Sequence, residues 1–386
     1  MKFFNREKEI NEILSVIESE PQLIYFIYGP INSGKSALIR EIIRNKLDKS
    51  KYVPFLIDFR QVSVGSFKDF IEAMFEVDYT TKIDDIKKYV KDFINWILEN
   101  TDTVSKLISM YSGVPLQIPA PILKLEEKEE RRIKNIYRYL KELFLEIRAK
   151  GKVPVFILDE LQMLKDISLN GNKSLLKSFF QFLVALTKVE HLAHVFCVSS
   201  DSLFIEHVYS SAELENRADY ILVDDFERKE ALEFIDFLIR ELLKEKIVLS
   251  KKEKERIYEL VGGKPVLLIK VINKLKTKSL DEVLSYLLQD EKAKIKMELE
   301  KFDYIKVKVL YENQEVEVKK EDVIEILKKF KDKGVLKKDE IKAPAYYYLI
   351  RKNILFLDPI KEILKPQSRL TWHAINRALK DLNLVS

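Results

Sequence analysis

Short apolar runs alternate with longer amphipathic segments through the first 226 residues of the chain. The runs are five to eight residues long and apolar on consecutive positions, as in strands that are buried on both faces of a sheet. The segments between them mostly carry apolar residues at helical spacing. This pattern predicts an α/β domain with a mainly parallel sheet and helices on both faces. The predicted strands are residues 23–28, 52–59, 153–158, 194–199 and 219–223.

One connection in this domain is far longer than a crossover requires. Residues 63–150 separate the second predicted strand from the third, whereas connections in compact α/β units are usually short. Apolar positions recur at helical spacing over residues 83–98 and 122–149, on either side of a Gly/Pro-rich segment at 112–121. We therefore predict a helical insertion within a domain of residues 1–226.

The pattern changes after residue 226, where the strand-like runs stop. The stretches that follow predict a bundle of short amphipathic helices over residues 227–290. A third domain, residues 291–386, completes the chain. The predicted helices of the bundle are residues 228–244, 251–260, 266–276 and 280–288.

The third predicted domain combines helices with strand-like segments. After an initial helix, a lysine-rich helix is predicted over residues 321–333 and a final amphipathic helix over 369–382. Two β-prone stretches, 335–341 and 346–357, predict a hairpin behind the lysine-rich helix, which is the outline of a winged helix. Residues 304–318 read partly as strand rather than as a further helix, so we predict a winged-helix-like domain.

Composition and charge narrow the class of protein. A chain of 386 residues with 47% hydrophobic residues can bury the two or three cores that the predicted domains require. The single cysteine, Cys197, excludes an internal disulfide, and we find neither an apolar leader nor a membrane span, so we expect a cytoplasmic protein. Basic residues outnumber acidic ones by 22 to 16 in residues 291–386, against 45 to 46 in the rest, so the basic excess is C-terminal.

The strongest chemical signal is the loop GPINSGKS at residues 29–36, directly behind the first predicted strand. It fits the phosphate-binding pattern GxxxxGK(S/T), and the helical pattern that follows would aim a helix N-terminus at an anion. A chance match is the alternative, but both flanks have the period that the motif requires. We expect Lys35 to reach the terminal phosphates of a nucleotide and the Ser36 hydroxyl to bind Mg²⁺. The predicted phosphate-binding residues are Gly29, Pro30, Ile31, Asn32, Ser33, Gly34, Lys35, Ser36 and Ala37.

Two adjacent carboxylates end the third predicted strand. Asp159 follows the apolar run 153–158 and is followed by Glu160, as in the Walker B element that accompanies a P-loop. Asp159 would complete the Mg²⁺ shell, and Glu160 would orient or deprotonate the attacking water, which points to hydrolysis. A solvated acidic turn is the alternative for this stretch taken alone.

Two further sites carry candidate catalytic side chains. The fourth predicted strand ends in Ser199 and Ser200, one of which would bond the γ-phosphate or the water, unless both belong to an ordinary turn or helix cap. Arg217 precedes the last predicted strand and would stabilise phosphate charge, either in its own subunit or in a neighbouring one. A solvated or structural arginine is the alternative, and the oligomeric state is left open.

The order of these motifs resembles the archaeal ATPase family of the STAND class, relatives of the AAA+ and origin-recognition ATPases. The resemblance rests on FNRE at residues 4–7, the P-loop, LDELQ at 158–162, SSD at 199–201, Arg217 and GGKP at 262–265. It implies an AAA+-like P-loop fold in which residues 227–290 form a lid over the nucleotide. It also implies that Asn5 and Arg6 border the adenine and that Pro265 packs near it, with Gly262 and Gly263 forming a tight turn. No arginine opens the helix after GGKP, which favours switching over motor action.

These features together predict a Mg²⁺-dependent ATPase that binds ATP and ADP. ATP is favoured over GTP because no guanine-reading N/TKxD string follows the fourth predicted strand. The basic residues within 319–352 would engage the phosphates of duplex DNA, with hydrolysis coupled to rearrangement of the C-terminal domain. Interleaved acidic residues leave a solvated charged face as the alternative. The competing function is a nucleotide-gated switch that binds a protein partner, with slow turnover and no direct role in DNA binding.

Overall fold

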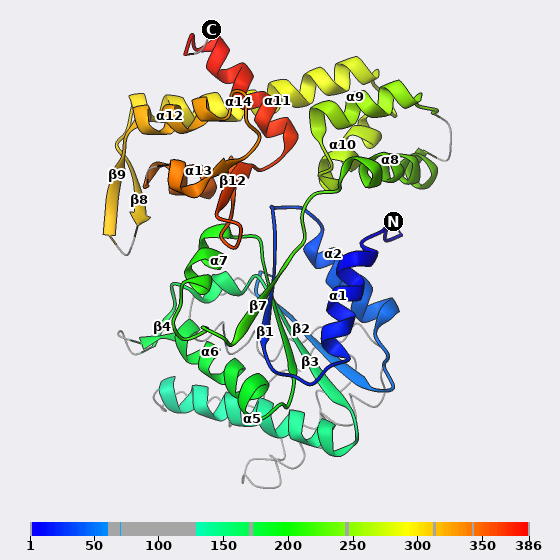
Figure 1. Cartoon of the computed structure of the whole chain (residues 1–386), viewed down its shortest axis with the longest axis vertical. Coiled ribbons are helices and arrows are strands. Elements are labelled where there is room, and N and C mark those ends of the chain that lie inside the picture. The colour runs from blue at the N-terminus through cyan, green and yellow to red at the C-terminus, as the bar shows by residue number, and fades with distance from the viewer. Residues whose placement is uncertain are drawn as a thin grey trace, which may run out of the picture.

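A parallel five-stranded sheet forms the centre of the N-terminal domain in the computed structural model (Figure 1). The structure describes residues 2–60, 70, 129–169, 173–243, 247–311, 314–341 and 343–384. This sheet confirms the predicted α/β fold and all five predicted strands. Most of the predicted insertion at 63–150 lies outside the described residues. In spatial order the strands are β2 (Tyr52–Asp58), β3 (Val153–Asp159), β6 (His194–Ser199), β1 (Ile24–Tyr28) and β7 (Ala218–Leu222).

Successive side chains of the strands enter two different cores. In β3, Phe156 and Leu158 join one apolar cluster, while Val155 and Ile157 join the other, as the period of two in a strand requires. Because both faces are covered, the strands are apolar at almost every position. The first core includes residues of α5 (Glu129–Ala149), α6 (Leu175–Val184) and α7 (Ser202–Tyr209), and the second includes residues of α1 (Glu7–Ile17) and α2 (Lys35–Glu41).

Four helices follow β7 and confirm the predicted bundle, which we call the lid. The last of them, α11 (Leu280–Glu300), continues without interruption through the predicted domain boundary at residues 290/291. Its first half packs in the lid core through Leu284 and Leu287, and its second half packs in the C-terminal core through Ile295 and Leu299. One helix therefore joins the two domains. The other helices of the lid are α8 (Arg228–Leu243), α9 (Lys251–Val261) and α10 (Pro265–Lys274).

We define the C-terminal module as β8 to α14. It has the predicted winged-helix-like outline, but one of the predicted strands is partly a helix. Residues 346–351 belong to a helix, not to the predicted strand at 346–357. Three consecutive tyrosines favour a strand by propensity, but the burial of Ala345, Tyr346, Leu349 and Ile350 in the module core has helical spacing, which a helix satisfies. The elements are β8 (Val307–Tyr311), β9 (Gln314–Val318), α12 (Lys320–Lys329), β10 (Leu336–Lys337), α13 (Ala345–Arg351), β11 (Leu355–Asp358), β12 (Ile363–Pro366) and α14 (Arg369–Asp381), with β8 and β9 forming a hairpin and the sheet order β10-β12-β11.

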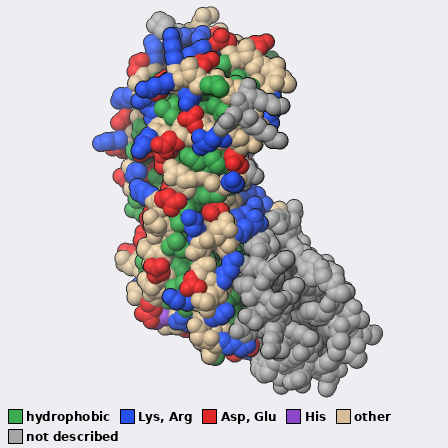
Figure 2. All heavy atoms as spheres, turned by 90° about the vertical axis from the view of Figure 1, so that its right-hand side faces the viewer, with side chains coloured by type: hydrophobic (Ala, Val, Ile, Leu, Met, Phe, Trp, Pro, Cys, Tyr) green, Lys and Arg blue, Asp and Glu red, His purple; other side chains and the backbone are tan. Residues whose placement is uncertain are grey.

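The lid and the C-terminal module lie side by side above the N-terminal domain (Figure 1). The domains exchange apolar side chains, because Phe356 of β11 packs in a core of the N-terminal domain and Leu203 of α7 packs in the module core. On the face drawn in Figure 2, Lys and Arg side chains are interspersed with Asp and Glu, in keeping with ion pairs such as Arg228–Glu255. None of the helices in the described part of the chain combines the length and the apolar character needed to cross a bilayer.

Candidate active site

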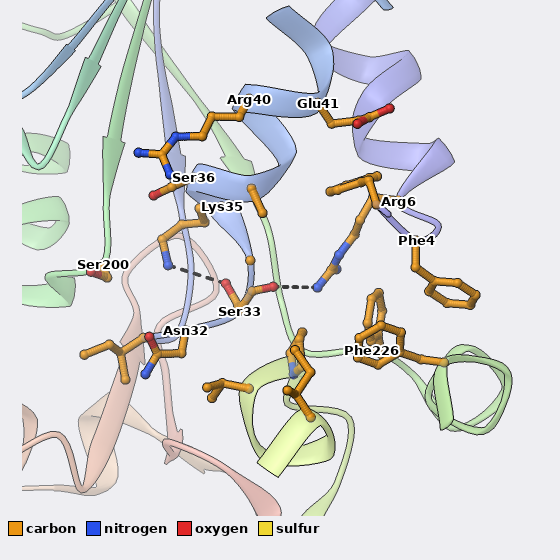
Figure 3. Close-up of a pocket in the computed structure, with 18 of the residues that line it drawn as sticks. Phe4, Arg6, Asn32, Ser33, Lys35, Ser36, Arg40, Glu41, Ser200 and Phe226 are labelled. Atoms are coloured by element: carbon orange, nitrogen blue, oxygen red, sulfur yellow. Dashed lines mark hydrogen bonds between the residues drawn. The ribbon is translucent and has the colours of Figure 1, made fainter. Parts of the chain in front are cut away.

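A cavity of about 630 Å³ lies where the carboxyl end of the sheet meets the N-terminal segment and the lid. Its volume is in the usual range for small-molecule sites. One end is polar and is lined by residues 31–37 of the P-loop with Arg60, Glu160 and Ser200. The other end is apolar and aromatic. The cavity therefore combines an end suited to phosphate groups with an end suited to a flat ring (Figure 3). The apolar lining includes Phe4, Phe226, Phe234, Pro265, Val266 and Ile269.

The P-loop has the backbone that its glycines allow. Gly34 has φ +102° immediately before α2 begins at Lys35. A Cβ at Gly29 would lie 2.1 Å from the carbonyl oxygen of Val223, so only glycine permits this close approach to the chain after β7. The loop and the start of α2 therefore place residues 31–37 along the cavity, where the N-terminus of the helix favours an anion.

Lys35 is folded back onto its own loop. Its Nζ donates hydrogen bonds to the carbonyl oxygens of Gly29 (2.9 Å) and Pro30 (2.8 Å), and Figure 3 shows its contact with Ser33. Burial and the nearby Lys264 lower the pKa of Lys35 to about 7. A phosphate would offer this ammonium stronger partners than two carbonyls and would favour its charged form.

Asp159, the last residue of β3, lies beside Ser36 of the P-loop, and of these two residues Ser36 lines the cavity. The carboxylate of Asp159 accepts a hydrogen bond from Ser36, and its buried Oδ1 has no hydrogen-bond partner. Burial, together with the charge of Asp58, raises the pKa of Asp159 to about 6 against the effect of the Ser36 bond. An unpaired buried carboxylate oxygen beside a hydroxyl is the donor set that Mg²⁺ accepts.

Glu160 is held by a set of partners that the sequence analysis missed in part. Its backbone has a left-handed conformation (φ 60°), and its Oε1 lies 2.9 Å from Nη2 of Arg60 and 3.3 Å from the Ser200 hydroxyl. Its Oε2 accepts a hydrogen bond from Gln162. Arg60 follows β2, which pairs with β3 so that Asp58 lies opposite Asp159. Only the strand order brings Arg60 to this carboxylate, and no local motif identifies it.

Ser199, the last residue of β6, and Ser200, which follows it, have different positions. Ser200 lines the cavity, whereas Ser199 is fully buried and donates to Oε1 of Gln162 at 2.8 Å. Asp201 caps α7 through bonds from the amides of Leu203 and Phe204, so the ordinary helix-cap reading holds for that residue. Of the two predicted sensor residues, Ser200 is therefore the one that a nucleotide would meet.

Arg6 and Pro265 line the cavity, and Asn5 is not among its lining residues. The Arg6 guanidinium donates to the carbonyl oxygens of Ser33 (2.8 Å) and Asp224 (2.7 Å) and stacks 4.3 Å from the Phe226 ring (Figure 3). It thereby joins the P-loop to the chain after β7. The Asn5 amide instead donates to Glu230 of the lid.

Arg217 lies at the other end of the sheet. Its carbonyl accepts the amide of Ile24 at the start of β1, and its guanidinium donates to the carbonyl of Glu213. The P-loop begins after Tyr28, so the two sites are separated by the length of β1, roughly 13 Å at 3.3 Å per residue. This placement contradicts a role of Arg217 at the phosphates of its own subunit. A role in a neighbouring subunit stays a prediction.

The GGKP turn joins three parts of the molecule. Lys264 donates to the carbonyl oxygen of Ile31 in the P-loop (2.9 Å) and pairs with Asp225 (3.0 Å). A Cβ at Gly263 would lie 1.7 Å from the carbonyl oxygen of Phe226, and one at Gly262 would lie 2.8 Å from Cβ of Arg369 in the module. The two glycines therefore allow close packing against the N-terminal domain and against the module.

The C-terminal module also contacts the P-loop directly, which the sequence analysis did not anticipate. The amide of Ile31 donates to Oε1 of Gln367 (3.2 Å), and the Tyr28 hydroxyl donates to Oδ1 of buried Asp358 (2.9 Å). These partners are more than 300 residues apart in sequence. Burial, with Asp358 beside it, raises the pKa of Tyr28, so this hydroxyl stays a hydrogen-bond donor over the physiological pH range.

Known proteins resemble both halves of the chain. Residues 3–271 match the family model of an ATPase domain predominantly from Archaea, and residues 281–379 match the C-terminal domain of uncharacterized MJ1010-like ATP-binding proteins. The uncharacterized ATP-binding proteins MJ1609 and MJ0147 of Methanocaldococcus jannaschii are 54% and 50% identical over 379 residues. These alignments cover 98% of this chain and 100% and 98% of the relatives. The Walker-type ATPase PABY2304 of Pyrococcus abyssi has the same fold (TM-score 0.61, 16% identity, 97% of this chain and 96% of that one).

Proposed function

The chain belongs to the family of ATPase domains found predominantly in Archaea and binds ATP, and from this premise we propose that its cavity hydrolyses ATP in a Mg²⁺-dependent reaction. The observation that carries the proposal is that Lys35, Ser36 and Glu160 line the polar end of the cavity, with Asp159 directly beside Ser36. Water oxygen would attack the γ-phosphorus, the bond from that phosphorus to the β–γ bridging oxygen would break, and ADP and phosphate would leave.

The residues at the polar end fit a magnesium ion. The Ser36 hydroxyl and the unpaired Oδ1 of Asp159 would hold it, and the phosphates and water would supply the remaining oxygens. When bound, the ion neutralises charge that develops on the phosphates. Lys35 would exchange the carbonyls of Gly29 and Pro30 for phosphate oxygens.

Glu160 is the residue that would orient the attacking water. Both of its oxygens are engaged, by Arg60 and Ser200 on one side and by Gln162 on the other. We infer that one of these oxygens is released when the water is bound. Glu160→Gln keeps the shape but removes the base, so turnover should fall by at least about a hundredfold while ATP binding is retained. Equal loss of binding would show that Glu160 supports the site rather than the reaction.

We further propose that the nucleotide controls how the module docks. The peptide groups of Ile31 are held from two sides, because its amide bonds Gln367 of the module and its carbonyl bonds Lys264 of the lid. When Lys35 leaves the carbonyls of Gly29 and Pro30 for phosphate, the loop around Ile31 loses two of its internal bonds. A change in the loop would therefore alter the hydrogen bond to Gln367 and, through it, the position of β11 and β12 of the module.

The predicted DNA contact remains the second candidate, favoured by the basic excess of residues 291–386. Many of these cations already have partners: Lys320 pairs with Asp303, Lys338 with Glu206 of α7, and Lys352 with Glu298. The hydroxyl of Tyr347 in α13 also donates to Glu206 (2.9 Å). The docked module thus turns part of residues 319–352 toward α7, which favours a nucleotide-gated protein switch.

Turnover with and without duplex DNA separates these two outputs. For the protein switch, DNA should change ATPase turnover by less than twofold at low salt, and binding should be weak. For the DNA-coupled version, stimulation should exceed this and should decline steeply between 50 and 200 mM salt, in the range where phosphate contacts weaken. The second result would restore DNA as the partner.

A further inference from the structure

A second cavity, of about 240 Å³, lies between the N-terminal domain and the C-terminal module. The N-terminal domain lines it with Ile31, Gln162 and Ser200, and the module lines it with Arg351, Asn353 and Gln367. Ile31 and Ser200 also line the nucleotide cavity, so these two residues separate the spaces. The second cavity therefore adjoins the nucleotide cavity at its polar end, on the side of Ser200.

The chemistry of this second cavity points to an anion at its border. Among its lining residues, Arg351 is the one cation, and Asp201, the one carboxylate, is occupied in capping α7. The guanidinium of Arg351 donates a long hydrogen bond to the carbonyl oxygen of Leu310 (3.3 Å). Such a bond is weak, so the side chain can change partner at low cost.

Four other arginines line the nucleotide cavity, and two of them lie on or just beyond α2: Arg40, which pairs with Asp58 (3.6 Å), and Arg44. Arg60 pairs with Glu160, and Arg6 holds the carbonyls of Ser33 and Asp224. Arg217 lies at the opposite end of the sheet. Phosphoryl transfer is usually assisted by an arginine that meets the terminal phosphate. Among the described residues, Arg351 is the arginine that lines the second cavity, and its side chain has no ion pair.

We propose that Arg351 senses the terminal phosphate of ATP from the C-terminal module of the same chain. The guanidinium would turn from Leu310 toward the border at Ser200 and Ile31 and pair with the γ-phosphate, so that ATP holds the module docked more strongly than ADP does. This proposal rests on the proposed ATP hydrolysis and names the residue through which the module distinguishes ATP from ADP.

Binding of ATP and ADP to Arg351→Ala tests the proposal. Affinities are measured by calorimetry with Mg²⁺, using a non-hydrolysable ATP analogue and ADP, and turnover is measured by phosphate release. The analogue should bind about tenfold more weakly or worse, ADP should change less than twofold, and kcat should fall by at least about tenfold. Lys352→Ala is the matched control, because Lys352 pairs with Glu298 and lines neither cavity. It should behave as wild type.

Arg351→Lys keeps the charge without the fork and should retain part of the discrimination between ATP and ADP. If Arg351→Ala does not fold, Arg351→Lys replaces it in the same binding measurements. Equal changes for the two nucleotides, or no change for either, in a variant that unfolds at the wild-type temperature would overturn the role of Arg351. Failure of the proposed function looks different, because the wild-type protein would then release no phosphate.

Discussion

The two ends of the central sheet bury polar groups of different kinds. At the carboxyl end, Asp159 keeps an unpaired oxygen and a raised pKa, and nearby Lys35, whose pKa is lowered, lines the cavity. At the amino end, burial lowers the pKa of His194 to about 4, so this imidazole is neutral, and its Nε2 also lacks a partner. A shifted pKa is therefore common to both ends. What distinguishes the carboxyl end is that residues of opposite charge lie together there beside a cavity. Open α/β sheets bind their ligands at this end.

The largest expected effect comes from removing the ammonium at the carboxyl end. Lys35→Ala should abolish stabilisation by nucleotide, which for the wild type is about 2.7 kcal/mol when the ligand is at a hundred times its Kd. Thermal unfolding with and without ADP or ATP measures this. Lys46→Ala, an exposed lysine beyond the cavity that pairs with Glu7, is the control and should keep the full shift. Unchanged stabilisation in Lys35→Ala would place the nucleotide elsewhere.

Arg60→Ala should increase activity at the carboxyl end of the sheet, because it removes the ion pair that holds Glu160. Without the 2.9 Å ion pair, Oε1 of Glu160 keeps only its weaker bond from Ser200 and binds the water more readily, so basal turnover should rise about three- to tenfold. Arg60→Lys, which keeps the charge but not the fork, should lie between wild type and alanine. Phosphate release at saturating ATP is the measurement. A decrease in turnover would instead give Arg60 a direct role at the phosphates.

The pH dependence of magnesium binding tests the state of Asp159. Magnesium requires the carboxylate, so the gain in nucleotide affinity that Mg²⁺ gives should be level above about pH 6 and should fall by up to tenfold per unit below it. The affinity without Mg²⁺ is subtracted at each pH, because Lys35 itself loses its charge above about pH 7 in the free protein. The stability of the ligand-free protein depends on pH in the opposite direction. Because burial raises the pKa, the protonated form stabilises the fold at low pH, and this contribution is lost as pH rises through about 6.

Asp159→Asn is the control for both effects and should remove them. Calorimetry of ADP with Mg²⁺ between pH 5 and 8 gives the first profile, and thermal unfolding of the free protein gives the second. An affinity that does not change between pH 7 and pH 5 in the wild type would contradict a magnesium site at Asp159.

The smallest effect is expected at the amino end. Arg217 makes local bonds to Glu213 and the chain of β1, so Arg217→Ala should change unfolding free energy by about 0.5 kcal/mol and leave turnover in dilute solution within twofold. Turnover that rises with protein concentration in the wild type but not in this variant would support the predicted role in a neighbouring subunit. A large loss in dilute solution would contradict the contrast between the two ends.

The part of the site that could be predicted is the part encoded by neighbours in sequence. A P-loop needs its glycines, lysine and serine within eight residues, and Asp159 and Glu160 stand at the end of their own strand, so the sequence alone indicates both elements. Arg60, Gln367 and Asp358 could not be found in this way, because strand order and domain docking bring them to the site from 100 residues away or more.

The errors have related physical causes. Tyrosines 346–348 favour strand by propensity, but packing of α13 in the module core determines a helix. Arg217 was linked to phosphates by its place before a strand, but in a parallel sheet the start of a strand is the end away from the P-loop. In both cases the local sequence pattern does not determine the structure. Packing in the module core determines the helix, and the direction of the parallel strands determines the place of Arg217.

Single-turnover phosphate release with Mg²⁺, in wild type and Glu160→Gln at matched nucleotide occupancy, tests the central claim most directly. The claim is that the carboxyl end of the sheet hydrolyses ATP through Glu160. We predict phosphate release by the wild type that EDTA abolishes, and release at least about a hundredfold slower in Glu160→Gln with ATP still bound. Release at the same rate in both proteins, or in EDTA, would contradict it.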